Sequence, residues 1–306
     1  MDRSIELRRL VDEYIDSSDG WFLTADIWNQ FNVKSREAKK IVWERLKELE
    51  DKGTLEKQGK KYRKRQRGRR LDAKANPEDK VVINWPRSIE DDSDFMLDRV
   101  TLFKKAVVVV TGVSNKGKTT FCLNVVVENL DHPTLKVKYI TNELADEELA
   151  DRLRKMSWID AWDGDGEYRF EAVELFEEWQ DEIEPDYINI IDYLDPGENF
   201  FAVGRFIDII RQRLRNGIAI IALQKGTSKY RGRDGKDHFS INQYGVGGQF
   251  SEHRARLVLH IDPTDDGRMM LTIKKAKGSL TGKRFTFDIV NSGSQFHDIC
   301  EVTDDL

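Results

Sequence analysis

The sequence has few cysteines and no long apolar run. Cys122 and Cys300 are the two cysteines among 306 residues, which excludes a disulfide framework, and no Cys/His spacing indicates a structural zinc site. No apolar segment approaches the length of a membrane span, and the N-terminal sequence MDRSIELRRL lacks the apolar stretch of a signal peptide. Because 39% of the residues are hydrophobic, we expect a globular protein with a core. The cysteine count and the lack of long apolar runs lead us to expect a cytoplasmic protein with reduced thiols and no membrane contact.

Charge is divided unevenly along the chain. Residues 1–75 carry 20 Lys and Arg against 14 Asp and Glu, a balance of +6, whereas the remaining residues carry 30 against 41, a balance of −11. Clustered Lys and Arg gain affinity for phosphates by releasing counterions. The composition therefore predicts a small basic domain that contacts a polyanion, followed by a larger acidic domain.

The stretch AVVVVTGVSNKGKTT, residues 106–120, carries the strongest functional signal. Its apolar run leads into GVSNKGKT, which fills every fixed position of the G-x-x-x-x-G-K-[ST] phosphate-binding loop. The two glycines let the backbone curl around a phosphate, the second lysine adds positive charge, and the threonine hydroxyl suits Mg²⁺. A plain turn between a strand and a helix is the alternative. The residues predicted to bind the nucleotide are Gly112, Ser114, Asn115, Lys116, Gly117, Lys118, Thr119 and Thr120.

Strands and helices alternate after this loop, which predicts an α/β domain over residues 99–306 with a mostly parallel sheet and crossover helices. The expected strands are 136–141, 187–192, 218–223, 256–261, 269–275 and 284–290. One expected helix follows Glu143 and ends at about Lys155. Two others are expected over 170–183 and 203–214.

Three polar residues end expected parallel strands, where ligands meet such sheets. Asp192 is predicted to hold Mg²⁺ through water together with Thr119, although a cap of the following turn is the alternative. Glu143 is placed to polarise an attacking water, and its alternative is a helix cap. Gln224 is expected to contact the γ-phosphate, unless it only bonds nearby backbone.

The basic N-terminal segment predicts three helices followed by a hairpin. Apolar residues recur at helical spacing over 4–15, Thr24 is expected to cap a helix over 25–31, and Ser35 a longer one from 36 to about 51. Two short basic strands follow, hinged on Gln58-Gly59-Lys60.

This arrangement over residues 1–65 resembles a winged helix-turn-helix. In that motif the second helix of the pair enters the major groove of DNA and the hairpin touches phosphates. The first role falls to Arg36, Lys39, Lys40 and Trp43, and the second to Lys60, Lys61, Arg63, Lys64 and Arg65. A protein-docking domain with solvated charges is the alternative.

Two segments are predicted to lack regular structure. Residues 66–98 are expected to be a linker, first basic and then acidic, with Phe95, Met96 and Leu97 on the surface of the next domain. Residues 226–249 are rich in glycine and polar residues, so we expect a long loop. Its charged and aromatic residues are typical of single-strand binding, unless the loop is merely solvated; they are Lys229, Tyr230, Arg231 and Arg233.

The larger domain, over roughly residues 100–290, resembles the RecA-like ATPase core and specifically the DnaB-type replicative helicase branch. TNEL at 141–144, IIDYL at 190–194 and ALQK at 222–225 are similar to that branch's catalytic-Glu, Walker B and Gln-bearing segments. The resemblance implies an oligomeric ring or filament with ATP between subunits, whose γ-phosphate receives positive charge from a neighbour. A winged helix-turn-helix stands where that branch has a helical N-terminal domain, which leaves unwinding open.

KKAKGSLTG, residues 274–282, resembles the segment of that branch that supplies the neighbour's charge. Lys275 and Lys277 match its two basic positions, but the second is Lys rather than Arg and lacks the planar fork that bridges two phosphate oxygens. Arg284 is a substitute candidate, and a plain basic strand edge is the alternative.

Two functions therefore compete at the level of the sequence. The first is a DNA-dependent ATPase that acts as an oligomeric motor on DNA, either helicase or translocase. The second is an ATP-controlled DNA-binding switch, such as a replication initiator, recombination mediator or transcriptional regulator. A P-loop kinase is a distant third, because no lid or acceptor-site pattern is visible.

Overall fold

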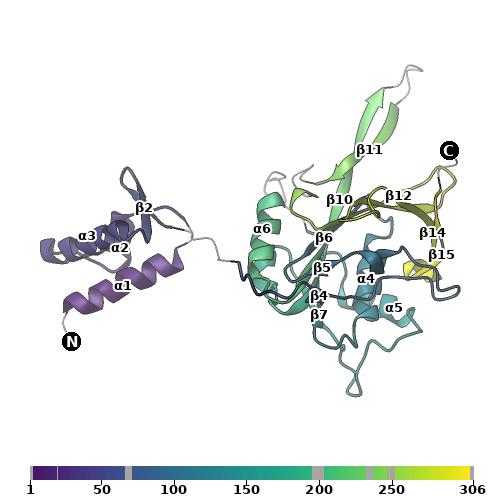
Figure 1. Cartoon of the computed structure of the whole chain (residues 1–306), viewed down its shortest axis with the longest axis horizontal. Coiled ribbons are helices and arrows are strands. Elements are labelled where there is room, and N and C mark those ends of the chain that lie inside the picture. The colour runs from purple at the N-terminus through teal and green to yellow at the C-terminus, as the bar shows by residue number, and fades with distance from the viewer. Residues whose placement is uncertain are drawn as a thin grey trace. The chain divides into compact units, whose positions relative to one another are not determined.

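The computed structural model describes residues 3–18, 20–65, 71–194, 203–231, 237–246, 248 and 252–303. It divides into two compact units, Met1–Ala75 and Asn76–Leu306, each with its own hydrophobic core (Figure 1). No helix in these described ranges is long and apolar enough to cross a membrane.

The first unit contains three helices and a three-stranded antiparallel sheet in the order β1-β3-β2. Its core is formed where the apolar faces of the helices meet, and Val11, Ile27, Val42 and Leu46 are fully buried there. The elements are α1 (Arg3–Ser17), β1 (Phe22–Leu23), α2 (Thr24–Gln30), α3 (Arg36–Asp51), β2 (Leu55–Gln58) and β3 (Lys61–Lys64).

Local sequence signals explain most of these boundaries. Ser35 caps α3 as predicted, since its hydroxyl accepts a hydrogen bond from the Ala38 N–H at 3.1 Å. The predicted cap Thr24 is wrong by one residue. Leu23 occupies the cap position of α2, because the Asp26 carboxylate accepts its N–H at 2.7 Å and Thr24 is already helical.

The second unit is built on a ten-stranded mixed sheet flanked by helices, so the α/β class is confirmed. Six strands run parallel in the order β12-β6-β10-β9-β7-β8, while β13, β14 and β15 continue antiparallel beyond β12 and β11 pairs antiparallel with β10. The strands are β6 (Val107–Gly112), β7 (Lys136–Thr141), β8 (Glu171–Glu174), β9 (Tyr187–Asp192), β10 (Ile218–Arg231), β11 (Asp237–Gly245), β12 (Leu257–Pro263), β13 (Met269–Lys275), β14 (Arg284–Val290) and β15 (Gln295–Glu301).

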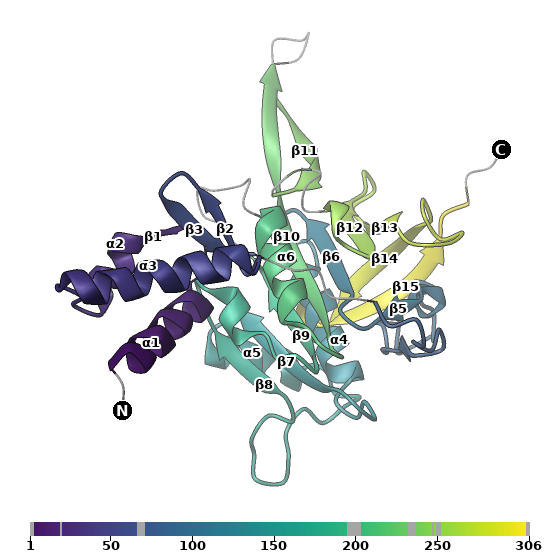
Figure 2. The same ribbon diagram turned by 60° about the vertical axis from the view of Figure 1, so that its left-hand side comes forward.

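Helices cover both faces of the parallel strands. Figure 2 shows α6 (Val203–Arg213) in front of the sheet, and α4 (Lys118–Glu128) and α5 (Asp146–Arg154) lie behind it. Alternate residues of β6 serve the two sides: Val108 and Val110 belong to the core cluster with α4, whereas Val107 and Val109 belong to the cluster with α6. All six residues of β6 are consequently buried, as the continuous apolar run predicts.

Smaller elements complete the second unit. β4 (Lys80–Val81) and β5 (Leu102–Phe103) form a separate two-stranded sheet, and three 3₁₀ turns interrupt the loops of the described part of the unit. These turns are η1 (Leu97–Arg99), η2 (Trp179–Glu182) and η4 (Asn291–Gly293).

The predicted helix over 170–183 is wrong. Residues Glu171–Glu174 form the edge strand β8, which pairs parallel with β7 from Lys138↔Glu171 to Thr141↔Glu174, and only the turn η2 is helical. The helical spacing of Phe176, Trp179 and Ile183 misled the prediction, because backbone pairing with β7 outweighs a short apolar stripe.

The predicted loop over 226–249 is also wrong. β10 continues to Arg231 and returns as β11, so the described part of this segment is an antiparallel hairpin paired from Lys225↔Gly245 to Arg231↔Asp237. Figure 1 shows this hairpin projecting from the sheet. Its residues pair with each other rather than with a core, which explains why their polar composition did not reveal strands.

The expected linker also ends earlier than predicted, because the second unit begins at Asn76. Phe95 and Leu97, which were expected to pack on the surface of the next domain, are fully buried within the second unit. The Phe95 ring packs edge-on against Phe287 and Phe296, with centroids 5.3 and 5.5 Å away. The acidic segment is therefore anchored in the core of the second unit by its apolar residues.

Candidate functional site

The residues between β6 and α4 form a tight loop at the carboxyl end of the parallel sheet. Gly117 adopts φ +91° immediately before α4, a conformation that glycine reaches without strain. A Cβ on Gly117 would lie 2.5 Å from Ile289 Cδ1, and one on Gly112 would lie 2.5 Å from the carbonyl oxygen of Ile261. Gly112 is thus required by the backbone beside it, and Gly117 by its positive φ.

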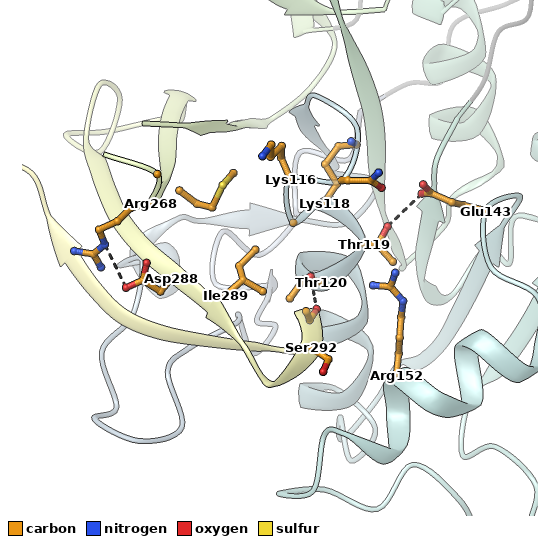
Figure 3. Close-up of a pocket in the computed structure, with 15 residues that line it drawn as sticks. Lys116, Lys118, Thr119, Thr120, Glu143, Arg152, Arg268, Asp288, Ile289 and Ser292 are labelled. Carbon is orange, nitrogen blue, oxygen red and sulfur yellow. Dashed lines mark hydrogen bonds and ion pairs between the residues drawn. The ribbon is translucent and has the colours of Figure 1, made fainter. Parts of the chain in front are cut away.

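A cavity of about 470 Å³ opens above this loop (Figure 3). One wall is the loop and the first turn of α4, including the predicted Asn115, Lys116, Gly117, Lys118, Thr119 and Thr120. Glu143 and Arg152 line another side. Of the predicted loop residues, Gly112 and Ser114 do not line the cavity.

Lys118 points its ammonium group back over the loop. Its Nζ donates a hydrogen bond to the Val113 carbonyl oxygen at 2.8 Å, and the side chain is mostly buried. Burial lowers the pKa of Lys118, while the carboxylates of Asp192 and Glu143 act in the opposite direction. A cation in this position favours an anionic ligand that takes over its hydrogen bond.

Glu143 is held against the start of α4 (Figure 3). Its Oε2 accepts a hydrogen bond from Thr119 Oγ1 at 3.3 Å, and its backbone N–H donates to Thr141 Oγ1 at 3.1 Å. Thr141 ends β7, so the strand fixes the turn that carries the carboxylate.

Asp192 lies beneath the cavity at the end of β9, directly across from Thr141 of β7. The side chain is fully buried, and one oxygen accepts a hydrogen bond from the Tyr139 hydroxyl at 2.7 Å. Burial raises the pKa of Asp192 to about 6, although the Tyr139 and Thr119 hydroxyls partly offset that effect. The other oxygen, Oδ1, has no hydrogen-bond partner among the described residues.

These features fit a magnesium-bound phosphate. A buried, unpartnered carboxylate oxygen is costly unless a cation or water satisfies it, and Asp192 Oδ1 is such an atom. No group of three or more His, Cys, Asp or Glu side chains able to hold a metal exists within the described ranges. Mg²⁺ commonly binds through one or two protein oxygens together with waters and substrate phosphates, so Thr119 and Asp192 are the residues that could hold it.

Gln224 ends the part of β10 that lies beside the loop. It is paired in register with Gly112, and its carbonyl oxygen accepts the Val246 N–H at 2.8 Å. The side chain is half-buried but does not line the cavity. The next residue, Lys225, is buried and forms an ion pair with Asp262 at 2.6 Å, which ties the base of the β10–β11 hairpin to β12.

Lys275 and Lys277 are not brought to the cavity that contains Lys118. Lys275 ends β13, and its Nζ donates hydrogen bonds to the carbonyl oxygens of Glu252 and His253, both at 3.0 Å. Both lysines line a different cavity, at the amino ends of the parallel strands. Arg284, at the start of β14, lies outside the phosphate-loop cavity as well.

Sequence reasoning missed one wall of the cavity. The start of β13, the end of β14 and the turn η4 complete it with Arg268, Met269, Asp288, Ile289 and Ser292. This wall is fixed to α4, since Thr120 Oγ1 donates to the Gly293 carbonyl oxygen at 2.6 Å. No local pattern reveals such a contact, because its partners are 173 residues apart.

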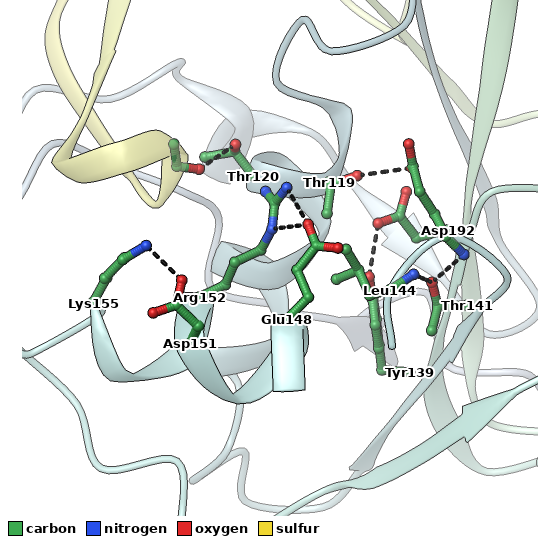
Figure 4. Close-up of polar contacts among 12 residues, drawn as sticks. Thr119, Thr120, Tyr139, Thr141, Leu144, Glu148, Asp151, Arg152, Lys155 and Asp192 are labelled. Carbon is green, nitrogen blue, oxygen red and sulfur yellow. Dashed lines mark hydrogen bonds and ion pairs between the residues drawn. The ribbon is translucent and has the colours of Figure 1, made fainter. Parts of the chain in front are cut away.

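Arg152 was missed too. It lies on α5 and donates two hydrogen bonds to Glu148 Oε1, at 2.9 and 3.2 Å. This i,i+4 pair is an ordinary signal of a solvated helix face, so its place beside the cavity is visible only in three dimensions (Figure 4).

The residues predicted to bind DNA in the first unit lie on α3 and on the β2–β3 hairpin. Trp43 is 48% exposed, and Lys47 lies over its ring. Three of the predicted cations are engaged inside the unit: Lys39 lies over the Trp28 ring at 4.7 Å, Arg63 pairs with Glu56 at 2.8 Å, and Lys40 pairs with Glu44 at 3.7 Å.

The other cations predicted to contact DNA in the first unit are exposed, and they are Arg36, Lys60, Lys61, Lys64 and Arg65. In the second unit, Lys229 and Arg231 lie on β10, but their side chains are outside the described part of the structure. Arg233 lies entirely outside the described residues.

No protein-family model matches the chain, and no curated protein sequence matches it. The function is therefore inferred from the motifs of the sequence and from the residues around the phosphate-loop cavity.

Proposed function

We propose that the chain is an ATPase that acts on DNA, with a RecA-like second unit and a winged helix-turn-helix first unit. One observation carries the proposal: the loop after β6, Glu143 after β7 and Asp192 at the end of β9 meet around Thr119 and Lys118. The carboxyl ends of parallel strands are where such sheets bind ligands. Three strands thereby deliver the groups that phosphoryl transfer to water requires.

In this proposal the loop from Gly112 to Gly117 holds the phosphates with its backbone N–H groups, at the positive end of α4. Lys118 exchanges its hydrogen bond with the Val113 carbonyl for a phosphate oxygen and neutralises its charge. Thr119 and Asp192 would hold Mg²⁺, directly or through water. When bound, this ion supplies positive charge to the phosphate oxygens.

Glu143 is the proposed general base. It is the exposed carboxylate of the cavity wall and is kept in place by Thr119 and Thr141, whereas Asp192 is buried below the loop. An exposed carboxylate can accept a proton from water above the nucleotide, and such general-base catalysis contributes about 10²–10⁴-fold to rate. The two carboxylates therefore take different roles because their burial differs.

Lys275 and Lys277 support an oligomer. They line a cavity at the amino ends of the parallel strands, away from the phosphate loop of the same chain. Any charge that they supply to a nucleotide therefore reaches the nucleotide of another copy. A ring or filament of identical subunits, as in the DnaB-type branch that the motifs resemble, would use them in this way.

A DNA-binding switch is the second candidate. It is favoured by the first unit, which has its own core and an exposed tryptophan on the helix expected to enter the major groove. In that case ATP would set the oligomeric state, while the first unit selects the DNA site.

The test is to measure ATP hydrolysis by the full chain without DNA, with single strands and with duplex. Native mass would be recorded in parallel, with and without a non-hydrolysable ATP analogue. Stimulation by single strands supports the motor. Slow hydrolysis that ignores DNA, combined with sequence-selective duplex binding, supports the switch. The absence of nucleotide binding would refute both.

A further inference from the structure

A second cavity, the basic cavity, lies at the amino ends of the parallel strands. It has a volume of about 380 Å³, within the range of about 300–1,000 Å³ typical of ligand pockets. Ala106 and Val107, where β6 begins, form part of its floor. β6 then runs six residues to Gly112, so the phosphate loop is about 17 Å away and the two cavities are separate.

Seven of the twelve residues that line the basic cavity are Lys or Arg, and none is Asp or Glu. This concentration occurs in a unit that carries 30 Lys and Arg against 41 Asp and Glu over residues 76–306. A surface of average composition would instead place carboxylates among these cations. The cavity is thus positively charged within a unit whose net charge is negative.

Most of these cations are not neutralised. Only Lys104 and Arg254 have carboxylate partners among the described residues, Asp79 at 3.7 Å and Asp208 at 3.4 Å. Both are exposed pairs at the rim, which contribute little to stability.

The others face the cavity with their charge available. Within the described ranges, Lys275 and Arg256 donate hydrogen bonds to backbone carbonyl oxygens alone, which position the cation without cancelling its charge. Lys105, Arg211 and Lys277 have no ion-pair partner within the described ranges. Five cations gathered in this way repel one another, and an anion between them relieves that repulsion.

An aromatic ring lies beside these charges. Phe103 lines the cavity and is 39% exposed, and the Arg256 guanidinium lies 5.7 Å from the centre of its ring. Cations that follow a phosphate backbone, combined with an aromatic face on which a base can stack, are typical of sites for single-stranded nucleic acid.

We propose that the basic cavity binds single-stranded DNA, with Lys105, Arg211 and Arg256 on its phosphates and Phe103 stacked on a base. This contact is separate from the phosphate-loop cavity of the same chain and from the first unit, and it does not use Lys275 or Lys277, which the oligomer proposal assigns to the nucleotide of another copy. It requires neither ATP nor hydrolysis, so it stands or falls independently of the ATPase proposal.

The test compares two arginines of one helix. Arg211 lines the basic cavity, whereas Arg205 is an exposed arginine of α6 that does not. Binding of fluorescein-labelled oligothymidylate to the full chain would be measured by anisotropy over a range of salt, without nucleotide. Arg211→Gln should weaken binding roughly fivefold and reduce the slope of log K against log salt by about 0.7, the value for one phosphate contact of a single strand.

Arg205→Gln should leave both quantities unchanged. Lys105→Asn, which keeps a residue tolerant of the observed φ of +63°, should act like Arg211→Gln and add to it. The same differences should persist in a background carrying Lys60→Gln and Lys61→Gln, which weakens the expected contacts of the first unit. Circular dichroism melting would verify that each variant is folded.

Two results would overturn the proposal. One is an Arg211→Gln salt slope equal to that of the Arg205→Gln control. The other is a loss of DNA-free ATP hydrolysis in Arg211→Gln with unchanged DNA binding, because the basic cavity would then serve a neighbouring copy's nucleotide.

Discussion

Replacing Glu143 by Gln is expected to stop ATP turnover while leaving nucleotide binding intact. The amide has the length and shape of the carboxylate. Its oxygen can still accept the hydrogen bond from Thr119 Oγ1, which lies 3.3 Å from Glu143 Oε2 in the wild type. The Glu143 N–H donates to Thr141 through the backbone, so the turn is also retained. What the amide lacks is the ability to take a proton from water.

The expected loss follows from that single difference. General-base catalysis contributes about 10²–10⁴-fold, equivalent to about 2.7–5.5 kcal/mol of the activation barrier. The effect on folding should be small by comparison, because Glu143 is exposed and a hydrogen bond contributes about 1 kcal/mol to stability. A large kinetic effect with normal stability is therefore the signature of the proposed role.

Single-turnover hydrolysis of labelled ATP would measure the chemical step, and titration with a fluorescent ATP analogue would measure affinity. Glu147→Gln is the matched control, since Glu147 is an exposed carboxylate four residues away in the first turn of α5. Hydrolysis by Glu143→Gln at the wild-type rate would refute the base assignment. An equal loss in Glu147→Gln would show that general charge, rather than position, is responsible.

Three further outcomes are expected. Lys118→Ala should abolish nucleotide binding in calorimetric titration with Mg²⁺ and ATP, because the buried cation of the loop is lost; binding at wild-type affinity would contradict its role. Leu46→Ala should destabilise the first unit by about 2–5 kcal/mol in urea, whereas the exposed Leu71→Ala should change stability by less than about 0.5 kcal/mol. Hydrogen bonds from Lys52 and Arg45 lower the pKa of Glu48 from 4.5 to about 2, so its contribution to stability is present above about pH 4.5 and is lost as the pH falls towards 2. The urea midpoint of unfolding should therefore fall less steeply between about pH 4.5 and pH 2 in Glu48→Gln than in the wild type. An equal pH dependence of the two midpoints would show that ionised Glu48 does not stabilise the fold.

Local patterns were sufficient where a structure is specified by neighbouring residues. The apolar run, glycines and helix of residues 106–128 predict β6 and α4, and Ser35 predicts the start of α3. Asp192 and Glu143 were placed at strand ends for the same reason, since a buried strand is readable from its apolar residues. The position of each residue along the chain therefore came from the sequence.

Contacts between distant segments were beyond such patterns. The wall of the cavity formed by Arg268, Asp288 and Ser292 is assembled by antiparallel strands that add to the parallel sheet beyond β12. The edge strand β8 and the buried Phe95 likewise depend on partners elsewhere in the chain. In each case an interaction across the fold outweighed the local preference.

The sequence by itself determined the kind of chemistry on offer: a glycine-lined phosphate loop, two strand-end carboxylates and a basic N-terminal segment. Only the tertiary structure decided how these groups meet. It buries Asp192 and leaves Glu143 exposed, and it places Lys275 and Lys277 at the amino ends of the parallel strands, away from the phosphate loop. The physical reason is that burial and distance are properties of the packed strands, which bring together residues that are far apart in the chain.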